Sequence, residues 1–540
     1  MSKKVLFILL IAGCGGMLYD FGGTIIAPAI PYFEAIKLFT ADEISRLTAA
    51  VVLTAAFASL FAGTLAEKFG RKPSMLFAAA LAAFACFPIC LCDGNFWLFY
   101  AGRALQGIAA GLLGVIVPMY LAEALPASDR GKGAGVFQFM DVGGILFCSL
   151  VGLAVVRFVG AADSPDVSTA SKVIAWKTIF WSSAAPAVLF FLGALGLDES
   201  PVWLAKKSKS KVEVEQGKDS NSDVRLETST QSDSLFQRKY VYPFLLAVVI
   251  LACHQATGIN SMQYYALKMF QDAGLSNAAA NVGFMVFTGM MLLMTVVACA
   301  FVDRKGRKFL LMLGTAGIIV SHLAAAGIFW HIEHSRSDVT SYVKTLVNDA
   351  KTLDVSVAAA VNQAADKDRF LAEGLVRDDT QLVLTYRQGG DIAQEIAEKQ
   401  DGRLSIQPKP EAKDNTLEVV RAELGTRPSP SMGWLVVLAL IAYISAFSIG
   451  PGVVVWLALS ELMPDRIRAN GMAIAMFINM MVAYYIADRL LSLALEYGYS
   501  PVLIGFACST VIYFLTATFF LPETKGKTLA EIEAFFAKGK

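Results

Sequence analysis

One carboxylate, that of Asp20, interrupts an otherwise apolar run of residues 5–28. A charged group inside a membrane-spanning segment is costly, so such residues by default take part in function, often in moving protons or ions. Burial favours the neutral form of a carboxyl group, which can therefore bind a proton in a closed site and release it when the site opens. Asp20 is our first candidate for proton coupling. The alternative is a permanent buried ion pair with a structural role.

Two short charged motifs each occur twice. An acidic residue, a Gly, an Arg and a Lys stand together at 67–72 and again at 303–308, and a Glu and an Arg seven residues apart flank a Pro in two further places. Glycine permits a tight turn, and the cations can reach carboxylates and helix C-termini on neighbouring segments. We interpret these charges as an inner gate, formed by Glu67, Arg71, Glu123, Arg130, Asp303, Arg307, Glu461 and Arg468. The alternative is that the cations only set the orientation of the chain.

Composition indicates the class of protein. Hydrophobic residues make up 56% of the 540 residues and charged residues 17%, whereas soluble domains carry about 25% charged residues. This excludes a soluble enzyme and indicates an integral membrane protein. The net charge of +1 gives no overall field that favours nucleic acid. The four His and eight Cys have no metal-ligand spacing, and we expect neither a metal nor another resident cofactor.

Twelve segments are apolar enough to cross a bilayer as helices, which requires about 20 residues each. Their apolar runs are continuous rather than alternating, which favours helices over barrel strands. The segments are 5–28, 47–66, 74–92, 97–121, 134–156, 176–197, 241–267, 279–302, 309–330, 433–459, 469–493 and 501–521. The first continues past the length of a signal peptide, so we interpret it as a retained span rather than a cleaved leader.

Lys and Arg are distributed unevenly between the loops. With the N-terminus inside, 25 of them fall in the inner segments and 6 in the short outer loops. Positive residues concentrate on the cytoplasmic side of membrane proteins. We therefore expect a multi-pass protein of the cell membrane, a bacterial inner membrane, with both termini in the cytoplasm.

Two polar stretches interrupt the spans. The first separates six spans from six; the second falls outside, between the ninth and tenth spans, with helices expected at 339–365 and 391–399. The second stretch can cap the outer entrance, contact a partner or be an inert decoration. The expected domains are a six-helix bundle at 1–200, a cytoplasmic linker at 201–240, a second bundle at 241–330 and 432–521, an extracytoplasmic insertion at 331–431 and a cytoplasmic tail at 522–540.

The spacing of the repeated motifs gives the length of this insertion. Gly70 and Gly306 are 236 positions apart, whereas Glu123 and Glu461 are 338 positions apart. The difference of 102 residues is almost the length of the second polar stretch. Two homologous halves are typical of alternating-access transporters. We therefore predict an all-α membrane protein with twelve transmembrane helices in two pseudo-symmetric six-helix bundles, and an extra outer domain between helices 9 and 10.

Six motifs, in order, resemble those of the sugar porters of the major facilitator superfamily, which include bacterial xylose–proton symporters and animal glucose facilitators. Together they cover the chain from about 15 to 527, apart from the linker and the insertion. They are Gly63…Arg71-Lys72, Gly102-Arg103…Arg130-Gly131, Asp198-Glu199-Ser200-Pro201, Gln255…Tyr264-Tyr265, Gly450-Pro451-Gly452…Trp456…Glu461 and Pro522-Glu523-Thr524-Lys525-Gly526. The resemblance implies two bundles around a sugar site in the middle of the membrane, and Glu199 joins the inner-gate candidates.

The resemblance also implies roles for individual residues. Asp20 matches the aspartate of the xylose–proton symporters, and Arg103 matches the family arginine that pairs with it until protonation releases the pair. The implied substrate-binding residues are Gln138, His254, Gln255, Asn260, Tyr264, Trp456 and Asn479. Neutral amides beside an aromatic face suit a sugar, because amides both donate and accept hydrogen bonds.

Three positions depart from the family pattern. His254 replaces a glutamine, Met291 an asparagine and Met480 a tryptophan. His254 is a candidate for contact with the substrate, for titration or for helix packing. These changes leave the identity of the sugar open.

We therefore expect a transporter, not an enzyme, that imports a monosaccharide, a pentose or hexose, by proton symport through alternating access. The alternatives are a proton-independent sugar facilitator and a transporter-like sugar sensor. The expected partners are a small-molecule sugar and the lipid bilayer, with no nucleic acid, and the protein is expected to be monomeric.

Overall fold

Lipid cannot hydrogen-bond the backbone, so apolar segments of this length fold as helices that satisfy their own polar groups. The computed structural model describes residues 3–126, 129–216, 237–348, 352–372, 375–399, 402–407, 417–464 and 467–523, and the single residues 531 and 536. Within this part of the chain, 12 helical spans are long and apolar enough to cross a membrane. They correspond one to one with the twelve predicted segments, and the predicted fold of twelve membrane helices is confirmed.

The first half of the chain contains six spans. They are formed by α1 (Lys3–Thr24), α3 (Ala41–Phe69), α4 (Arg71–Phe84) with α5 (Cys86–Cys90), α6 (Phe96–Ala124), α7 (Arg130–Phe158), and α8 (Thr169–Trp181) with α9 (Ala184–Leu195). The short α2 (Ile30–Ala35) follows the first span, and α10 (Pro201–Gln216) follows the sixth.

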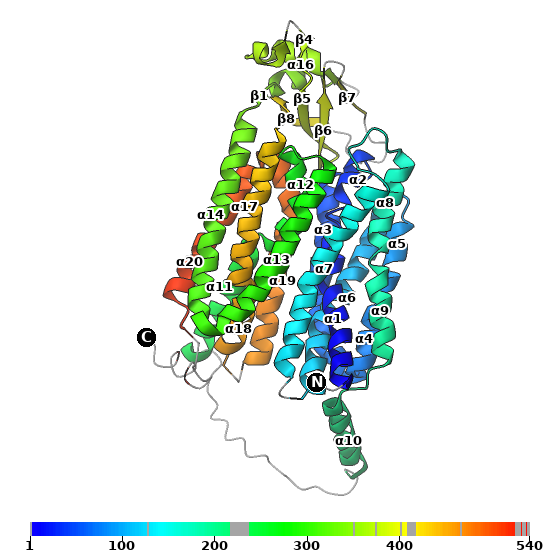
Figure 1. Ribbon diagram of the computed structural model, residues 1–540, viewed down its shortest axis with the longest axis vertical. Coiled ribbons are helices and arrows are strands. Elements are labelled where there is room, and N and C mark those ends of the chain that lie inside the picture. Colours follow the sequence, from blue (N-terminus) through cyan, green and yellow to red (C-terminus); the bar gives the residue numbers. More distant parts are fainter. Residues whose placement is uncertain are drawn as a thin grey trace.

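The second half repeats this plan. Its spans are α11 (Arg238–Ala256) with α12 (Ile259–Asp272), α13 (Asn277–Lys305), α14 (Arg307–His334), α17 (Pro430–Ile449) with α18 (Pro451–Leu462), α19 (Arg468–Tyr497) and α20 (Tyr499–Phe519). Figure 1 shows the two halves side by side, with α10, the start of α1 and the end of α20 near one end of the bundle. We call this the linker end and the opposite end the domain end.

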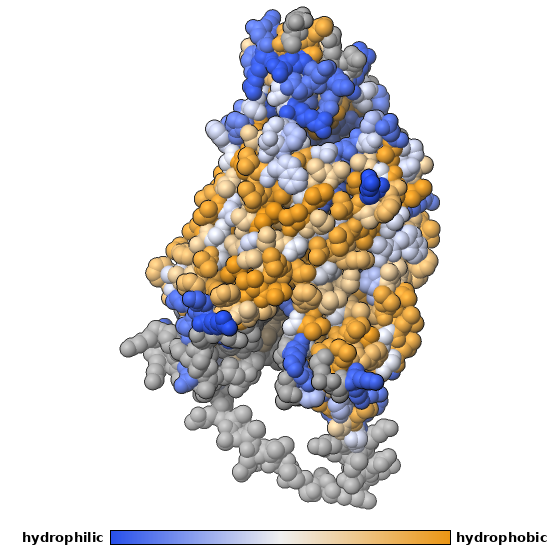
Figure 2. Space-filling model, viewed as in Figure 1, coloured by the Kyte–Doolittle hydropathy of each residue, from blue (hydrophilic) through white to orange (hydrophobic). Residues whose placement is uncertain are grey.

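The surface agrees with a membrane location. Figure 2 shows apolar residues around the helices and hydrophilic residues concentrated at the top of the molecule, with further polar clusters near the linker end. Large apolar side chains such as Phe61, Phe158 and Phe519 are among the most exposed. An exposed apolar surface of this extent is stable in lipid rather than in water. The chain is therefore a multi-pass membrane protein.

In the part of the chain that the structure describes, the two halves share a hydrophobic core at one end. Towards the domain end, one cluster joins residues of both halves, such as Phe33 and Phe180 with Tyr265 and Phe329. Towards the linker end, each half has its own cluster, one around Leu113 and the other around Leu311. Among the described residues, the halves are thus packed together near the domain end and have separate cores near the linker end.

A small folded domain lies between α14 and α17, above the bundle in Figure 1. Its elements are β1 (Ser337–Asp338), α15 (Thr340–Thr345), β2 (Leu353–Ser356), α16 (Val357–Gln363), the 3₁₀ helix η1 (Lys367–Phe370), β3 (Leu371–Ala372), β4 (Leu375–Val376), β5 (Thr380–Gln388), β6 (Asp391–Glu398), β7 (Arg403–Ile406) and β8 (Leu417–Thr426). An antiparallel sheet has the strand order β1-β8-β5-β6, and β2 pairs with β7. We call this unit the sheet domain.

The predicted helices in this insertion are wrong. Residues 391–398 form strand β6, and 339–365 contain two short helices with a strand between them. Gly389 and Gly390 have φ of 62° and 94°, so they form the two-residue turn of a hairpin. Each residue of β6 then pairs with β5, and this pairing overrides the helix preference of its Ala, Gln and Glu residues. The Gly-Gly pair was the signal that our sequence analysis missed.

Glycines let two spans cross closely beside the candidate proton site. A Cβ atom on Gly16 of α1 would lie 2.5 Å from the Phe137 carbonyl oxygen of α7, and one on Gly144 of α7 would lie 2.4 Å from that of Met17. Backbone atoms cannot move aside easily, so both positions require glycine. This contact fixes how α1 and α7 face each other.

We expect Gly144→Ala to destabilise the protein, whereas the neighbouring Gly143→Ala will not. A Cβ on Gly143 meets nothing within 4 Å. Overpacking typically costs about 1–3 kcal/mol, so the midpoint of thermal unfolding in detergent should fall for Gly144→Ala alone. Equal midpoints for the two variants would contradict this close contact.

Candidate functional site

The seventh span is broken at Gly258, which has φ of 83°, between α11 and α12. The break leaves carbonyl groups without helical partners in the middle of the membrane, where neighbouring helices must satisfy them. The Thr257 carbonyl accepts hydrogen bonds from His322 Nε2 at 3.0 Å and from the Tyr443 hydroxyl at 3.2 Å. His322 is fully buried and was not predicted as a site residue. We interpret it as a positioning residue for the break.

Two predicted substrate-binding amides have buried polar atoms without hydrogen bonds in the described chain. Asn479 on α19 is 0% exposed, and neither its amide nitrogen nor its oxygen has a partner in the described chain. The side-chain oxygen of Gln255, three residues before the break, is also buried and unpaired. A buried polar group without a partner costs about 1–3 kcal/mol. These amides are therefore arranged for a polar ligand.

The other described substrate candidates lie on neighbouring elements. Asn260 is half-buried and Tyr264 is buried on α12, and Gln138 is half-buried on α7. A Cβ on Gly23 of α1 would lie 3.2 Å from the Tyr264 hydroxyl, so Tyr264 packs against the other half of the protein. The structure places these residues on both sides of the interface between the halves.

The three residues that depart from the family pattern, His254, Met291 and Met480, contact neighbouring side chains. The His254 ring is 5.1 Å from the Phe447 ring. Gln263 Nε2 lies 3.5 Å from the Met291 sulfur, which is a weak acceptor. Met480 packs against the core shared by the two halves. The structure leaves the three proposed roles of His254 untested.

Arg103 does not pair with Asp20 in this conformation. Its guanidinium is fully buried and donates to the carbonyl oxygens of Gly22, Gly23 and Leu47 and to Gln106 Oε1, at 2.5 to 3.1 Å. Gly22 and Gly23 belong to the last turn of α1, whose carbonyls have no further helical partner and attract a cation. Among the described residues Asp20 has no ion pair. The predicted contact between Asp20 and Arg103 is therefore not formed here.

A second carboxylate within the spans was missed by our sequence analysis. Asp141 on α7 is 7% exposed and lies one turn after Gln138, whose amide nitrogen donates to Asp141 Oδ2 at 3.1 Å. Asp141 interacts electrostatically with Asp20. It stands inside the predicted span 134–156, so the rule that identified Asp20 should have identified it as well.

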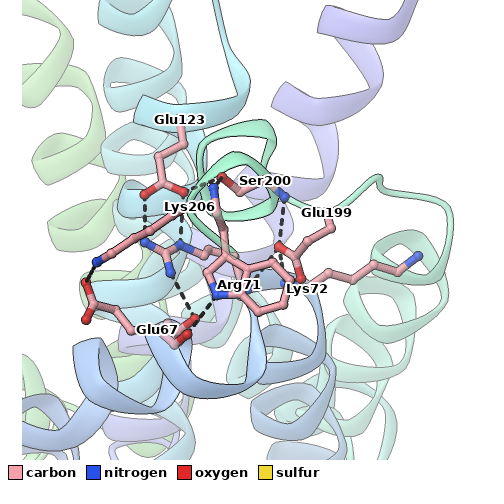
Figure 3. Close-up of polar contacts among 9 residues, drawn as sticks. Glu67, Arg71, Lys72, Glu123, Glu199, Ser200 and Lys206 are labelled. Atoms are coloured by element: carbon pink, nitrogen blue, oxygen red, sulfur yellow. Dashed lines mark hydrogen bonds and ion pairs between the residues drawn. The ribbon is translucent and has the colours of Figure 1, made fainter. Parts of the chain in front are cut away.

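At the linker end of the first half, the predicted gate charges form a network (Figure 3). Arg71 is 6% exposed and binds both oxygens of Glu123, at 2.8 and 2.9 Å. Ser200 donates to the same carboxylate. Glu67 instead pairs with Lys206 at the exposed surface, at 3.2 Å. The Arg71–Glu123 pair joins α4 to α6 and therefore stabilises the first half internally.

Glu199 caps a helix. Its carboxylate accepts hydrogen bonds from the backbone nitrogens of Arg71, at 3.0 Å, and Lys72, at 3.3 Å, in the first turn of α4 (Figure 3). The N-terminus of a helix has unpaired N–H groups and a partial positive charge, which a carboxylate stabilises. A Cβ on Gly70 would lie 2.3 Å from this carboxylate. The glycine of the motif is therefore required by the close approach and by its φ of 107°.

Glu523 is the equivalent cap in the second half and was not predicted. It accepts hydrogen bonds from the backbone nitrogens of Arg307, at 3.1 Å, and Lys308, at 3.2 Å. A Cβ on Gly306 would lie 2.7 Å from its carboxylate. The glutamate after the sixth span and the glutamate after the twelfth thus have the same function. A comparison of the residues that follow the sixth and the twelfth spans would have identified Glu523 from the sequence.

The side chains of several other candidates lie outside the described part of the structure. They are Arg130, Asp303, Trp456, Glu461 and Arg468. Their roles remain predictions.

A buried ion network ties the two halves together at the domain end. Lys268 on α12 binds Glu34 on α2 at 3.1 Å and Asp272 at 2.8 Å, and its side chain is only 9% exposed. The Tyr499 hydroxyl of α20 donates to the other oxygen of Asp272. These contacts join the first half to the second where the shared core is also found.

The sheet domain bridges both halves above this network. From the first half, Arg46 binds Asp391 of β6 at 2.8 Å and Lys37 binds Glu395 at 2.8 Å. From the second half, Glu496 of α19 binds Arg387 of β5 at 3.2 Å. A cavity of about 880 Å³ lies beneath the sheet and is lined by residues of the sheet domain and both halves.

The fold and this site define a membrane transporter for small polar solutes. Residues 31–347 and 418–536 match the family described as sugar (and other) transporter, so the chain belongs to that family. Most of the sheet domain lies between the two matched ranges. The chain is thus a transporter of sugars or polyols rather than an enzyme.

Known relatives cover nearly the whole chain. A probable inositol transporter of Arabidopsis thaliana is 28% identical over 98% of this chain and 91% of its own length. The glucose transport protein of Synechocystis is 25% identical over 98% of both chains. The crystal structure of a D-xylose–proton symporter shares the fold, with a TM-score of 0.65 and 21% identity over 97% of this chain and 100% of that one.

We expect Arg71→Ala to destabilise the protein far more than Lys206→Ala. Removing one partner of a buried ion pair costs about 3–5 kcal/mol, because Glu123 remains buried without its cation. Lys206 belongs to the exposed pair with Glu67, and such pairs contribute about 0–1 kcal/mol. Thermal unfolding in detergent compares the two variants, and similar losses would show that the Arg71–Glu123 pair has no special role.

Proposed function

We propose that the protein is a proton symporter that carries a monosaccharide or a related polyol through the membrane by alternating access. The observation that carries the proposal is the unpaired polar centre of the bundle. Asn479 has a buried amide without a partner and Gln255 has a buried side-chain oxygen without one. Asp20 lies within α1 and has no ion pair among the described residues. Neutral amides suit hydroxyl groups, and an unpaired carboxylate in a membrane span suits proton uptake. The relatives, which include inositol and glucose transporters, support the substrate class.

We further propose that the linker end faces the cytoplasm of the cell membrane and the domain end faces outside. The excess of Lys and Arg near the linker end supports this orientation. The separate cores near the linker end then correspond to a state closed towards the outside, in which the substrate leaves inwards. In this orientation the 880 Å³ cavity lies on the path of entry, and the sheet domain covers it.

Uptake into proteoliposomes tests the transport reaction. The panel includes labelled pentoses, hexoses and inositol, with and without an inward proton gradient. We expect the wild type to accumulate one of these solutes when the gradient is present, and Asp20→Asn to exchange the solute without accumulating it. Equilibration that ignores the gradient would make the protein a facilitator, and binding of the solute without transport would make it a sensor.

The sheet domain is expected to oppose opening of the domain end, because its ion pairs with the first half must break when the halves separate there. The double variant Lys37→Ala and Arg46→Ala removes two such pairs. Partly exposed pairs contribute about 0.2–1 kcal/mol each, so the rate of solute exchange should rise about two- to thirtyfold if this opening is rate-limiting.

The matched control is Arg377→Ala, which removes an exposed pair with Asp379 within the sheet domain. It should leave the exchange rate unchanged. A double variant that exchanges at the wild-type rate would show that the sheet domain does not restrain opening.

A further inference from the structure

Asp141 and Asp20 lie beside a close contact between α7 and α1. On α1, Asp20 lies one turn after Gly16 and Met17. On α7, Asp141 lies between Phe137 and Gly144, one turn from each. These four residues form the contact in which the glycines meet backbone carbonyls. The contact therefore brings the two carboxylates together, and they interact electrostatically.

Within the described residues no cation reaches this pair. The titratable side chain that interacts with Asp141, apart from Asp20, is Tyr19 of α1, and Tyr264 of α12 interacts with Asp20. No Lys or Arg of α6, α8 or α13, which also pack on α7, interacts with Asp141. Arg103 donates to four other acceptors. Two neighbouring carboxylates in a nonpolar region repel each other when both are ionised, which favours a state in which they share one proton.

The pair is joined to the substrate region by one hydrogen bond. Gln138 Nε2 donates to Asp141 Oδ2 at 3.1 Å, while Asp141 Oδ1 is buried without a partner in the described chain. An ionised carboxylate accepts a hydrogen bond about twice as strongly as a neutral group. Ionised Asp141 therefore holds the Gln138 amide, and protonated Asp141 releases it.

We propose that Asp141 couples the proton to the solute: it shares one proton with Asp20, and its charge controls whether Gln138 can donate to a solute hydroxyl. The inference rests on the proposed symport. A proton from water forms one O–H bond on the carboxylate pair and later leaves to water on the other side, and no other bond changes. The solute binds more tightly when the pair holds its proton, and the proton binds more tightly when the solute is present.

The dependence of solute affinity on pH tests this role in the full-length protein. For the wild type, affinity should fall as pH rises, because the pair loses its proton, by at most about tenfold per pH unit for one linked proton. Asp141→Asn removes the charge, so its affinity should stay near the low-pH value at every pH. Its gradient-driven accumulation should be lost, while exchange continues. Asp141→Glu restores a carboxylate and should recover part of the pH dependence.

Asp488→Asn is the matched control. Asp488 is another acidic residue in a span, on α19, but it pairs with Arg489 at 3.2 Å. This variant should keep the wild-type pH dependence, and Asp141→Ser replaces Asp141→Asn if the latter does not fold. An Asp141→Asn or Asp141→Ser protein that accumulates solute with the wild-type pH dependence would overturn the role of Asp141 and leave the proposed symport unaffected. Failure of the wild type itself to respond to a proton gradient would instead overturn the proposed symport.

Discussion

The membrane supplies no hydrogen bonds, and this constraint organises the rest of the structure. Every polar group within the spans must find a partner in the protein or in the solute. Arg103 finds its partners in the carbonyls that end α1, and the carbonyl freed at the break in the seventh span finds His322 and Tyr443. Among the groups that remain unpaired in the described chain, Asn479, Gln255 Oε1 and Asp141 Oδ1 mark where we propose that a ligand or a proton is needed.

Charged side chains stabilise each half separately at the linker end and join the two halves at the domain end. At the linker end, Glu199 and Glu523 each cap a helix of their own half, and the Arg71–Glu123 pair also stays within one half. These charges make each half rigid without joining the halves. At the domain end, the pair of Glu34 with Lys268 and the contacts of the sheet domain cross between the halves. Separation at the domain end therefore breaks ion pairs, whereas none of the described pairs crosses at the linker end.

Local sequence signals predicted the elements that depend on local properties. The twelve spans follow from apolar length, and the two halves follow from the repeat of an acidic residue, Gly, Arg and Lys. The predicted turns are confirmed at Gly70 and Gly306, because positive φ and close approach leave no other residue possible. Strand β6 was mistaken for a helix, because its residues prefer helices and only its pairing with β5 makes it a strand. The Gly-Gly turn before it carried the local signal.

The sequence by itself determined which polar residues enter the membrane, since each charge or amide within an apolar run can be found by inspection. Only the tertiary structure decided how they are paired. Arg103 lies against the end of α1 rather than against Asp20, and Asp141 lies against Asp20 because Gly16 and Gly144 bring two helices, distant in the chain, into contact. The packing of these glycines against facing carbonyls fixes the rotation of each helix. A one-dimensional pattern cannot specify that rotation, because it depends on the shape of the partner helix.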